Sequence, residues 1–169
     1  IICNGAGNYA TWMHRFYQYR KYRTQLAPTS GSMGYGLPSA VAAKLVCPDR
    51  TVVSMNGDGC FMMHGQEMAT AMQYGANIIA IVVNNSMFGT IRMHQEKNYP
   101  ERIVSTDLVN PDFKLLCKGY HAHYENVKHS KMFSSALDRC LNSNKASVIE
   151  IEIDPKQITT RQRMKELNN

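Results

Sequence analysis

Two short polar motifs in the middle of the sequence combine residue types that can bind a metal ion and a phosphate group. Gly57-Asp58-Gly59 follows an apolar, β-branched run that ends near Met55, and Asn84-Asn85 follows a second such run that ends at Val83. Carboxylate and amide oxygens suit a hard cation such as Mg²⁺, which commonly completes its shell with phosphates and water. The glycines beside Asp58 allow the backbone to approach a phosphate closely, and free N–H groups at the start of the next helix would face the same anion. The two motifs therefore predict a Mg²⁺ and phosphate site.

The elements around these motifs should place them side by side. The 24 residues 60–83 suffice for one crossover helix and one strand, so that both motifs fall at the same edge of a sheet. Apolar runs alternate with helical segments, which predicts an α/β fold: a doubly wound, mostly parallel sheet with helices on both faces. In such a sheet the ligand lies beyond the carboxyl ends of the strands. The expected strands are 51–55, 78–83, 120–125 and 147–153, after a strand that ends at residue 3, and the expected helices are 37–46, 67–74, 111–118 (Asn110 as N-cap) and 130–141.

Size and composition indicate one domain, residues 1–169, of ordinary length. Ile1-Ile2-Cys3 is typical of the end of a strand without its beginning, so we expect a fragment of a longer, multidomain polypeptide. The five cysteines form no CxxC pair, which favours a reducing cytoplasm. No apolar run reaches the roughly 18 residues of a membrane span, and none is expected.

The net charge of +6 is densest in residues 15–23, where cationic and aromatic residues alternate. A nucleic-acid surface can be built in this way. We favour instead a helix end and loop whose tyrosines pack against a partner, and we expect no nucleic-acid binding. An anionic cofactor also suits a basic domain.

Gly-Asp-Gly followed at this spacing by Asn-Asn resembles the motif of thiamine-diphosphate-dependent enzymes. The resemblance implies that Asp58 and Asn85 supply side-chain oxygens to Mg²⁺, and that the backbone carbonyl of Met87 supplies a third. Cys60 stands where the family often has Ser or Ala, which weakens a hydroxyl contact there. The residues that the resemblance places around the diphosphate are Gly57, Asp58, Gly59, Cys60, Asn85, Met87, Phe88, Gly89 and Thr90.

Two upstream segments extend the resemblance. Residues 29–38 (TSGSMGYGLP) resemble the G-x-M-G-x-G-L-P stretch of the acetolactate synthase group, which places Gly31, Ser32 and Met33 against the cofactor. Gly31 would offer its carbonyl to the aminopyrimidine. The Met33 side chain would hold the cofactor bent, so that the pyrimidine's imino nitrogen can remove the thiazolium C2 proton. Residues 5–9 (GAGNY) resemble the family's G-x-G-Gln-His, with Asn8 and Tyr9 as the diphosphate contacts.

The function that the resemblance implies is that of a diphosphate- and Mg²⁺-anchoring domain in an acetolactate synthase-like transferase or lyase. Such an enzyme decarboxylates a 2-oxo acid, with or without joining the product to a second carbonyl compound. The activating glutamate is expected on a separate pyrimidine-binding domain, from another subunit of a homodimer or homotetramer. We therefore identify no catalytic residue in this chain and expect it to be inactive alone. FAD dependence of the full-length enzyme stays open.

Several further residues leave alternatives open. His94 stands where acetolactate synthase has a Trp, which keeps a 2-oxo-acid decarboxylase of the same superfamily as the alternative function. Arg92 could pair with a substrate carboxylate or form an ion pair. His64 and His94 are candidate substrate contacts, although polar loop residues are the simpler interpretation. Glu67 is better explained as a first-turn helix residue than as a catalytic acid.

A dinucleotide site is the less favoured alternative. Residues 5–10 satisfy G-x-G-x-x-A after an apolar stub, which is the fingerprint of an NAD(P)-binding Rossmann domain. The acidic residue that such a site requires about 20 positions later is missing, since residues 21–25 contain none.

Overall fold

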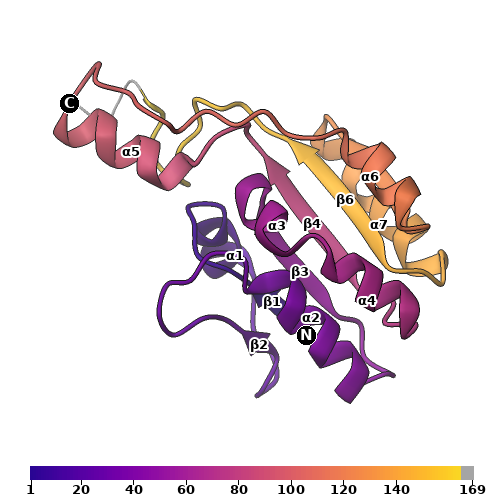
Figure 1. Ribbon diagram of the computed structural model, residues 1–169. Helices are drawn as coiled ribbons and strands as arrows, with labels where there is room; N and C mark the ends of the chain where they lie inside the picture. Colours follow the sequence, from indigo (N-terminus) through magenta and orange to yellow (C-terminus); the bar gives the residue numbers. More distant parts are fainter. Residues whose placement is uncertain (165–169) are drawn as a thin grey trace.

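The centre of the molecule is a six-stranded parallel sheet (Figure 1), seen in a computed structural model that describes residues 1–164. The strand order is β2-β1-β3-β4-β6-β5, and every pairing in it is parallel. The α/β prediction is confirmed, with the sheet parallel throughout rather than mostly parallel. The strands are β1 (Ile2–Asn4), β2 (Gln25–Leu26), β3 (Val53–Gly57), β4 (Ile79–Asn84), β5 (His123–Val127) and β6 (Ser147–Glu152).

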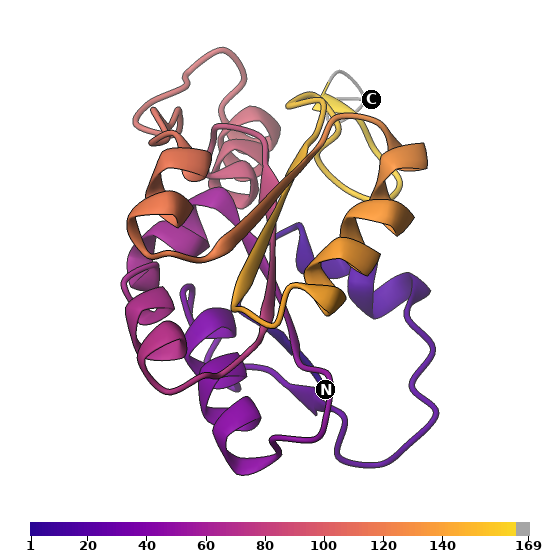
Figure 2. The ribbon, with the colours of Figure 1, turned by 90° about the vertical axis from the view of Figure 1, so that its right-hand side faces the viewer.

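Helices cover both faces of this sheet, as a doubly wound fold requires. Helices α2, α3, α4 and α6 lie on one face, and α1 and α7 lie on the other (Figures 1 and 2). Helix α5 stands apart, beyond the carboxyl end of β4. The helices are α1 (Ala10–Phe16), α2 (Gly36–Val46), α3 (Asp58–His64), α4 (Glu67–Gln73), α5 (Gly89–Asn98), α6 (Phe113–Gly119) and α7 (Phe133–Asn142), with a 3₁₀ turn, η1 (Ser130–Met132), before α7.

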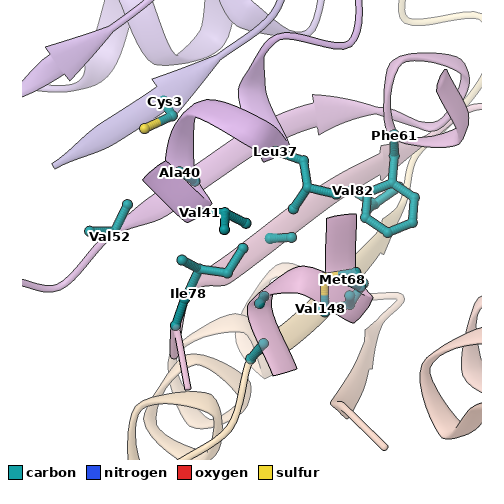
Figure 3. Close-up of a cluster of buried hydrophobic side chains, with 14 of the residues drawn as sticks. Cys3, Leu37, Ala40, Val41, Val52, Phe61, Met68, Ile78, Val82 and Val148 are labelled. Carbon is teal, nitrogen blue, oxygen red and sulfur yellow. The ribbon is translucent and has the colours of Figure 1, made fainter. Parts of the chain in front are cut away.

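The main core lies between the sheet and the face that carries α2, α3, α4 and α6 (Figure 3). Leu37 of α2, Phe61 of α3 and Met68 of α4 pack there with Val82 of β4 and Val148 of β6, and all five are at most 1% exposed. Full burial of such a side chain contributes roughly 1.5–3 kcal/mol. This packing holds the carboxyl ends of β3 and β4 in a fixed relation.

Several expected boundaries are shifted by local chemistry. The strand expected at 51–55 runs two residues further, to Gly57, so that α3 starts directly at Asp58. The strand expected at 120–125 begins only at His123, because the chain first turns at His121, whose φ is +60°. The helix expected from residue 111 starts at Phe113, and its N-cap is Asp112, which accepts a hydrogen bond from the Leu115 N–H at 2.9 Å. Asn110 as N-cap was therefore wrong.

The helix end expected near residues 15–23 is that of α1, which ends at Phe16, whereas helix α5 and the short strand β2 were not expected from the sequence. No residue of α5 is buried, and both residues of β2 are exposed. Neither segment therefore has the apolar stripe or alternation that reveals an element. Within the described residues, no helix combines the length and apolarity needed to cross a membrane.

Candidate functional site

A cavity of about 240 Å³ opens at the carboxyl ends of three adjacent strands, β1, β3 and β4. The chain continues from β1 to one side of the sheet and from β3 to the other, and ligands of open α/β sheets bind at such a switch point. Three loops and the starts of α3 and α5 form the walls. The lining residues are Ala6, Gly7, Asn8, Tyr9, Gly31, Met33, Gly57, Asp58, Gly59, Cys60, Val83, Asn85, Met87, Phe88, Gly89, Thr90 and Ile91.

This wall contains all but one of the residues that the sequence placed around a cofactor. The exception is Ser32, whose hydroxyl lies outside, 2.7 Å from that of Ser30 on the surface. Its backbone carbonyl accepts a hydrogen bond from the Ala6 N–H at 3.1 Å and so joins the loop of residues 29–35 to the loop after β1. Gly31 and Met33, on either side, do line the cavity.

Asp58 is the only charged side chain among these lining residues, and it is 2% exposed. Its Oδ2 accepts a hydrogen bond from Asn110 Nδ2 at 2.8 Å. Burial raises the pKa of the Asp58 carboxyl, while hydrogen bonds from Asn110 and from the backbone amides of Gly59 and Ser86 oppose that rise. The site thus holds one buried acid, which forms no ion pair with a cationic side chain in the part of the chain that the structure describes.

The two asparagines after β4 have separate environments. Asn85 lines the cavity, and its Oδ1 accepts a hydrogen bond from the Met87 N–H at 3.3 Å. Asn84 faces the sheet instead: its Nδ2 donates to Glu150 Oε1 at 2.6 Å. The next residue, Ser86, has a φ of +54°, and its N–H donates to Asn84 Oδ1 at 3.1 Å. This left-handed conformation costs a non-glycine residue roughly 1–2 kcal/mol, so the hydrogen bonds of Asn84 offset local strain.

The donor set suits Mg²⁺. Within residues 1–164, no cluster of three His, Cys, Asp or Glu residues could hold a metal ion. The oxygens available around the cavity are the Asp58 carboxylate, the Asn85 amide and the Met87 carbonyl, which also accepts the Gly89 N–H at 3.0 Å. One carboxylate with neutral oxygens is a ligand set for a hard cation that takes its remaining ligands from phosphate and water.

The charges around the cavity also favour a bound metal ion. No Lys, Arg or His is among the residues that line the cavity. A buried anion is costly unless a cation or hydrogen-bond donors compensate it. A diphosphate bound here would therefore depend on a metal ion and on backbone N–H groups. The first turn of α3 carries such groups, because the first four N–H groups of a helix have no partner within it.

Aromatic rings press directly on the glycines of the Gly-Asp-Gly motif. A Cβ atom on Gly59 would lie 2.6 Å from Phe88 Cε1, and one on Gly57 would lie 2.9 Å from Tyr9 Cδ1. The Tyr9 hydroxyl is buried without a hydrogen-bond partner among the described residues, and burial raises the pKa of its phenol. Both glycines are thus required for close packing, and Tyr9 stays neutral.

Asn8 and Thr90 connect the loop after β1 to the start of α5. The Asn8 N–H donates to Thr90 Oγ1 at 2.9 Å, and that hydroxyl donates to Asn8 Oδ1 at 3.0 Å. Asn8 Nδ2 donates to the Ile158 carbonyl at 3.0 Å. These contacts hold the base of α5 beside the cavity.

The other candidates from the sequence lie outside the cavity. Arg92 forms ion pairs with Asp107 at 3.1 Å and with Glu96 at 3.5 Å. Glu67 lies in the first turn of α4 and accepts a hydrogen bond from the Thr70 hydroxyl at 2.8 Å. His64 and His94 are exposed.

Asn110 is part of the site although the sequence suggested only a helix cap. A residue before proline is disfavoured in the α conformation, so Pro111 could have signalled that the cap lies later, at Asp112. Glu150 was not singled out, because the alternation of residues 147–153 predicts a half-exposed strand. It is 8% exposed.

A dinucleotide reading finds no support in the geometry. Helix α1 does follow β1 after a glycine-containing loop, as in a Rossmann unit. However, β2 consists of Gln25 and Leu26 and is followed by Ala27, so no carboxylate stands where a ribose would be bound.

Comparison with known proteins gives consistent matches. Residues 5–151 match the family described as thiamine pyrophosphate enzyme, C-terminal TPP binding domain. The chain is 32% identical over 149 residues to an acetolactate synthase of Arthrospira platensis, covering 87% of this chain and 26% of that protein. It is 30% identical over 156 residues to the acetolactate synthase isozyme 2 large subunit of Escherichia coli K12, covering 91% and 28%. It is 31% identical over 159 residues to the acetolactate synthase large subunit of Lactococcus lactis, covering 93% and 28%. The chain therefore spans about a quarter of the length of these relatives.

Proposed function

Because the chain belongs to the thiamine pyrophosphate enzyme family, as its C-terminal TPP-binding domain, we propose that it anchors Mg²⁺ and the cofactor's diphosphate in an acetolactate synthase-like enzyme. The observation that carries the proposal is the convergence of Asp58, Asn85 and Met87 on one cavity that lacks any cationic side chain. An NAD(P) site is not favoured, since it has neither the acidic residue nor the family match.

Each wall of the cavity has its own task in this proposal. The oxygens of Asp58, Asn85 and Met87 would hold Mg²⁺, and the backbone of residues 57–60 would bind the phosphates. Met33 supports the cofactor's bent shape from the opposite loop. Thiamine diphosphate, when bound, supplies a nucleophilic carbon that attacks the carbonyl carbon of a 2-oxo acid and allows CO₂ to leave. The chain itself would orient the cofactor through its phosphates and the bound metal ion.

The reaction that we propose for the whole enzyme is decarboxylation of a 2-oxo acid followed by joining to a second carbonyl compound. The printed names of the three relatives, all acetolactate synthases, support this choice. Simple decarboxylation is the alternative. Incubating the full-length enzyme with a panel of 2-oxo acids, with and without an aldehyde acceptor, separates the two by product, and an absorbance spectrum of the same protein tests for FAD.

We also propose that residues 1–169 form one domain of a longer enzyme, which is completed by a pyrimidine-binding domain of another subunit in a homodimer or homotetramer. Helix α5 borders the cavity yet buries no residue, and nearby Val109 is fully exposed. A partner surface would cover these groups. A cytoplasmic location is supported by the five cysteines, all of which are free thiols.

Isothermal titration with thiamine diphosphate and Mg²⁺ tests the anchoring role. Asp58→Ala should abolish Mg²⁺-dependent binding, because it removes the one carboxylate of the metal site. Asp138→Ala, which removes an exposed carboxylate from α7, is the matched control and should bind as the unchanged chain does. Equal affinity of Asp58→Ala and the unchanged chain would refute the metal assignment.

A further inference from the structure

A buried carboxylate on strand β6, which lies between β4 and the edge strand β5, has no role in the site described so far. Glu150 is 8% exposed, yet no cationic side chain within residues 1–164 forms an ion pair with it. Its partners are three hydrogen-bond donors from the two neighbouring strands: Asn84 Nδ2 of β4 at 2.6 Å, and the Tyr124 hydroxyl and Asn126 Nδ2 (3.4 Å) of β5. Burying a charge in this way is costly. Asn84, which hydrogen-bonds both Glu150 and Ser86, connects this carboxylate to the turn that carries the proposed metal ligands Asn85 and Met87.

A short chain of amides runs from Glu150 to Asp58. Asn84 donates from Nδ2 to Glu150, and its Oδ1 accepts from Asn110 Nδ2 at 3.0 Å. The same Asn110 Nδ2 donates to Asp58 Oδ2 at 2.8 Å. Two side chains therefore separate the carboxylate on β6 from the carboxylate that lines the cavity.

The two carboxylates at the ends of this chain, Glu150 and Asp58, determine how the two amides between them are oriented. An ionised carboxylate accepts hydrogen bonds and donates none, whereas an amide has one accepting and one donating end. Glu150 therefore requires the NH₂ end of Asn84, which leaves the Asn84 oxygen facing Asn110. Asn110 must in turn present its own NH₂, which is what the Asp58 carboxylate needs.

We propose that Glu150 is a positioning residue for the proposed metal site, acting through Asn84 and Asn110 to orient the Asp58 carboxylate. The inference rests on the proposed function, because it assigns Asp58 to the metal. Asn84 also accepts hydrogen bonds from the Ser86 N–H and hydroxyl, so Glu150 supports the strained turn between Asn85 and Met87 as well. Both the Asp58 carboxylate and the turn that carries Asn85 and Met87 are thus connected to one buried carboxylate, Glu150.

The surroundings of Glu150 agree with its acting as an acceptor. Burial and the hydrogen bond to Glu150 both raise the pKa of Tyr124, so its hydroxyl remains a donor. Burial, and to a smaller extent the negative charge of Glu150, raises the pKa of the Cys117 thiol to about 12. Both groups therefore keep their protons, so neither places a second negatively charged acceptor beside the Glu150 carboxylate.

The test is Glu150→Gln, which keeps the size of the side chain but adds a donating end. Glutamine can present its own NH₂ to Asn84, so that the Asn84 orientation is no longer imposed. Binding of Mn²⁺ in the presence of thiamine diphosphate, measured by electron paramagnetic resonance on the 169-residue chain, should weaken about 10- to 100-fold, as is typical when an outer-shell partner of a metal ligand is lost. Glu152→Gln is the matched control: Glu152 lies two residues later and pairs with Asn84 through the backbone, but the interactions of its carboxylate among the described residues are with the Asn126 and Lys128 side chains.

A double-mutant cycle separates positioning from general stability. Asn110→Ala interrupts the same chain, so its effect on Mn²⁺ affinity and that of Glu150→Gln should be non-additive. Additive losses, or unchanged Mn²⁺ affinity of folded Glu150→Gln, would overturn the inference. If Glu150→Gln does not fold by circular dichroism, Asn110→Ala alone decides, and unchanged affinity again overturns it. Failure of the unchanged chain to bind Mn²⁺ with thiamine diphosphate would instead contradict the proposed function.

Discussion

Single residues in this site have two kinds of task, and neighbours in the sequence divide them. Asn85 faces the cavity, whereas Asn84 binds Glu150 and shapes the turn at Ser86. The neighbouring loop shows the same division: Met33 lines the cavity and Ser32 does not. In the proposed metal site, adjacent polar residues thus combine a proposed ligand, Asn85, with a residue that shapes the turn beside it, Asn84.

Gly59→Ala tests the close packing at the Gly-Asp-Gly motif. The added Cβ would meet Phe88 Cε1 at 2.6 Å and Leu108 Cδ1 at 3.2 Å. We expect a loss of about 1–3 kcal/mol in the free energy of unfolding by overpacking, together with weaker binding of thiamine diphosphate, because Phe88 must move within the cavity wall. Urea denaturation and isothermal titration measure the two effects.

Gly119→Ala serves as the control for this substitution, since nothing lies within 4 Å of the added atom. It should leave cofactor binding unchanged and raise stability by about 0.4–1 kcal/mol through the unfolded state. If Gly59→Ala behaved like Gly119→Ala, the contact with Phe88 would have no energetic importance.

At the scale of elements, the edge strand β5 is attached to the molecule by charge as well as by backbone pairing. Glu125 of β5 accepts hydrogen bonds from Arg139 of α7 at 2.8 and 2.7 Å and lies 3.0 Å from His123 Nε2. The hydrogen bonds from Arg139 hold the pKa of the Glu125 carboxyl below its usual range. The strand next to β6 is thereby fixed to the helix behind the sheet.

This pair predicts an acid-sensitive part of the stability. Because the folded pKa of Glu125 is lowered, its contribution is present above the unfolded pKa, roughly pH 4, and is lost as the pH falls through the folded value. Arg139→Met should lower the melting temperature at neutral pH, and the gap to the unchanged chain should close in acid. Thermal melts from neutral pH to pH 2 check this.

Lys131→Met provides the comparison, since Lys131 is an exposed lysine of η1. Its melting temperature should follow that of the unchanged chain at each pH. A gap for Arg139→Met that persisted undiminished in strong acid would show that the side chain contributes packing rather than charge.

At the scale of the whole molecule, the cavity lies at the open end of the sheet, and its border is incomplete. Helix α5 extends beyond the sheet with no buried residue. At the other end, the aromatic and basic segment 15–23 is exposed, with Tyr22 at 88% and Phe16 at 63%. Aromatic side chains left in water in this number are typical of surfaces that a partner covers.

We therefore expect the 169-residue chain to bind thiamine diphosphate weakly and to turn over no 2-oxo acid by itself. In the enzyme that we propose, the activating glutamate lies on a pyrimidine-binding domain, and that partner closes the cavity. Release of CO₂ from a panel of 2-oxo acids, measured on the purified chain, checks this, with the full-length enzyme as the positive control. Robust decarboxylation by the chain alone would contradict it.

The sequence by itself determined the fold class and most of the cavity wall. Strands such as β4 can be recognised in the sequence because they are apolar on both faces. The carboxyl ends of parallel strands must also meet at one edge of the sheet. The positions of Asp58 and Asn85 followed from these two facts. Their chemistry could be read because ligand types and spacing are local properties of the chain.

Only the tertiary structure decided which polar residues outside the motifs belong to the site. Asn110 and Glu150 lie 52 and 66 residues from their partners Asp58 and Asn84, and their roles arise from strand order rather than from local pattern. Helix α5 could not be predicted from the sequence, because none of its residues is buried and it therefore has no apolar stripe. Local propensity and periodicity report what a segment buries. Long-range hydrogen bonds depend on which segments the sheet brings together.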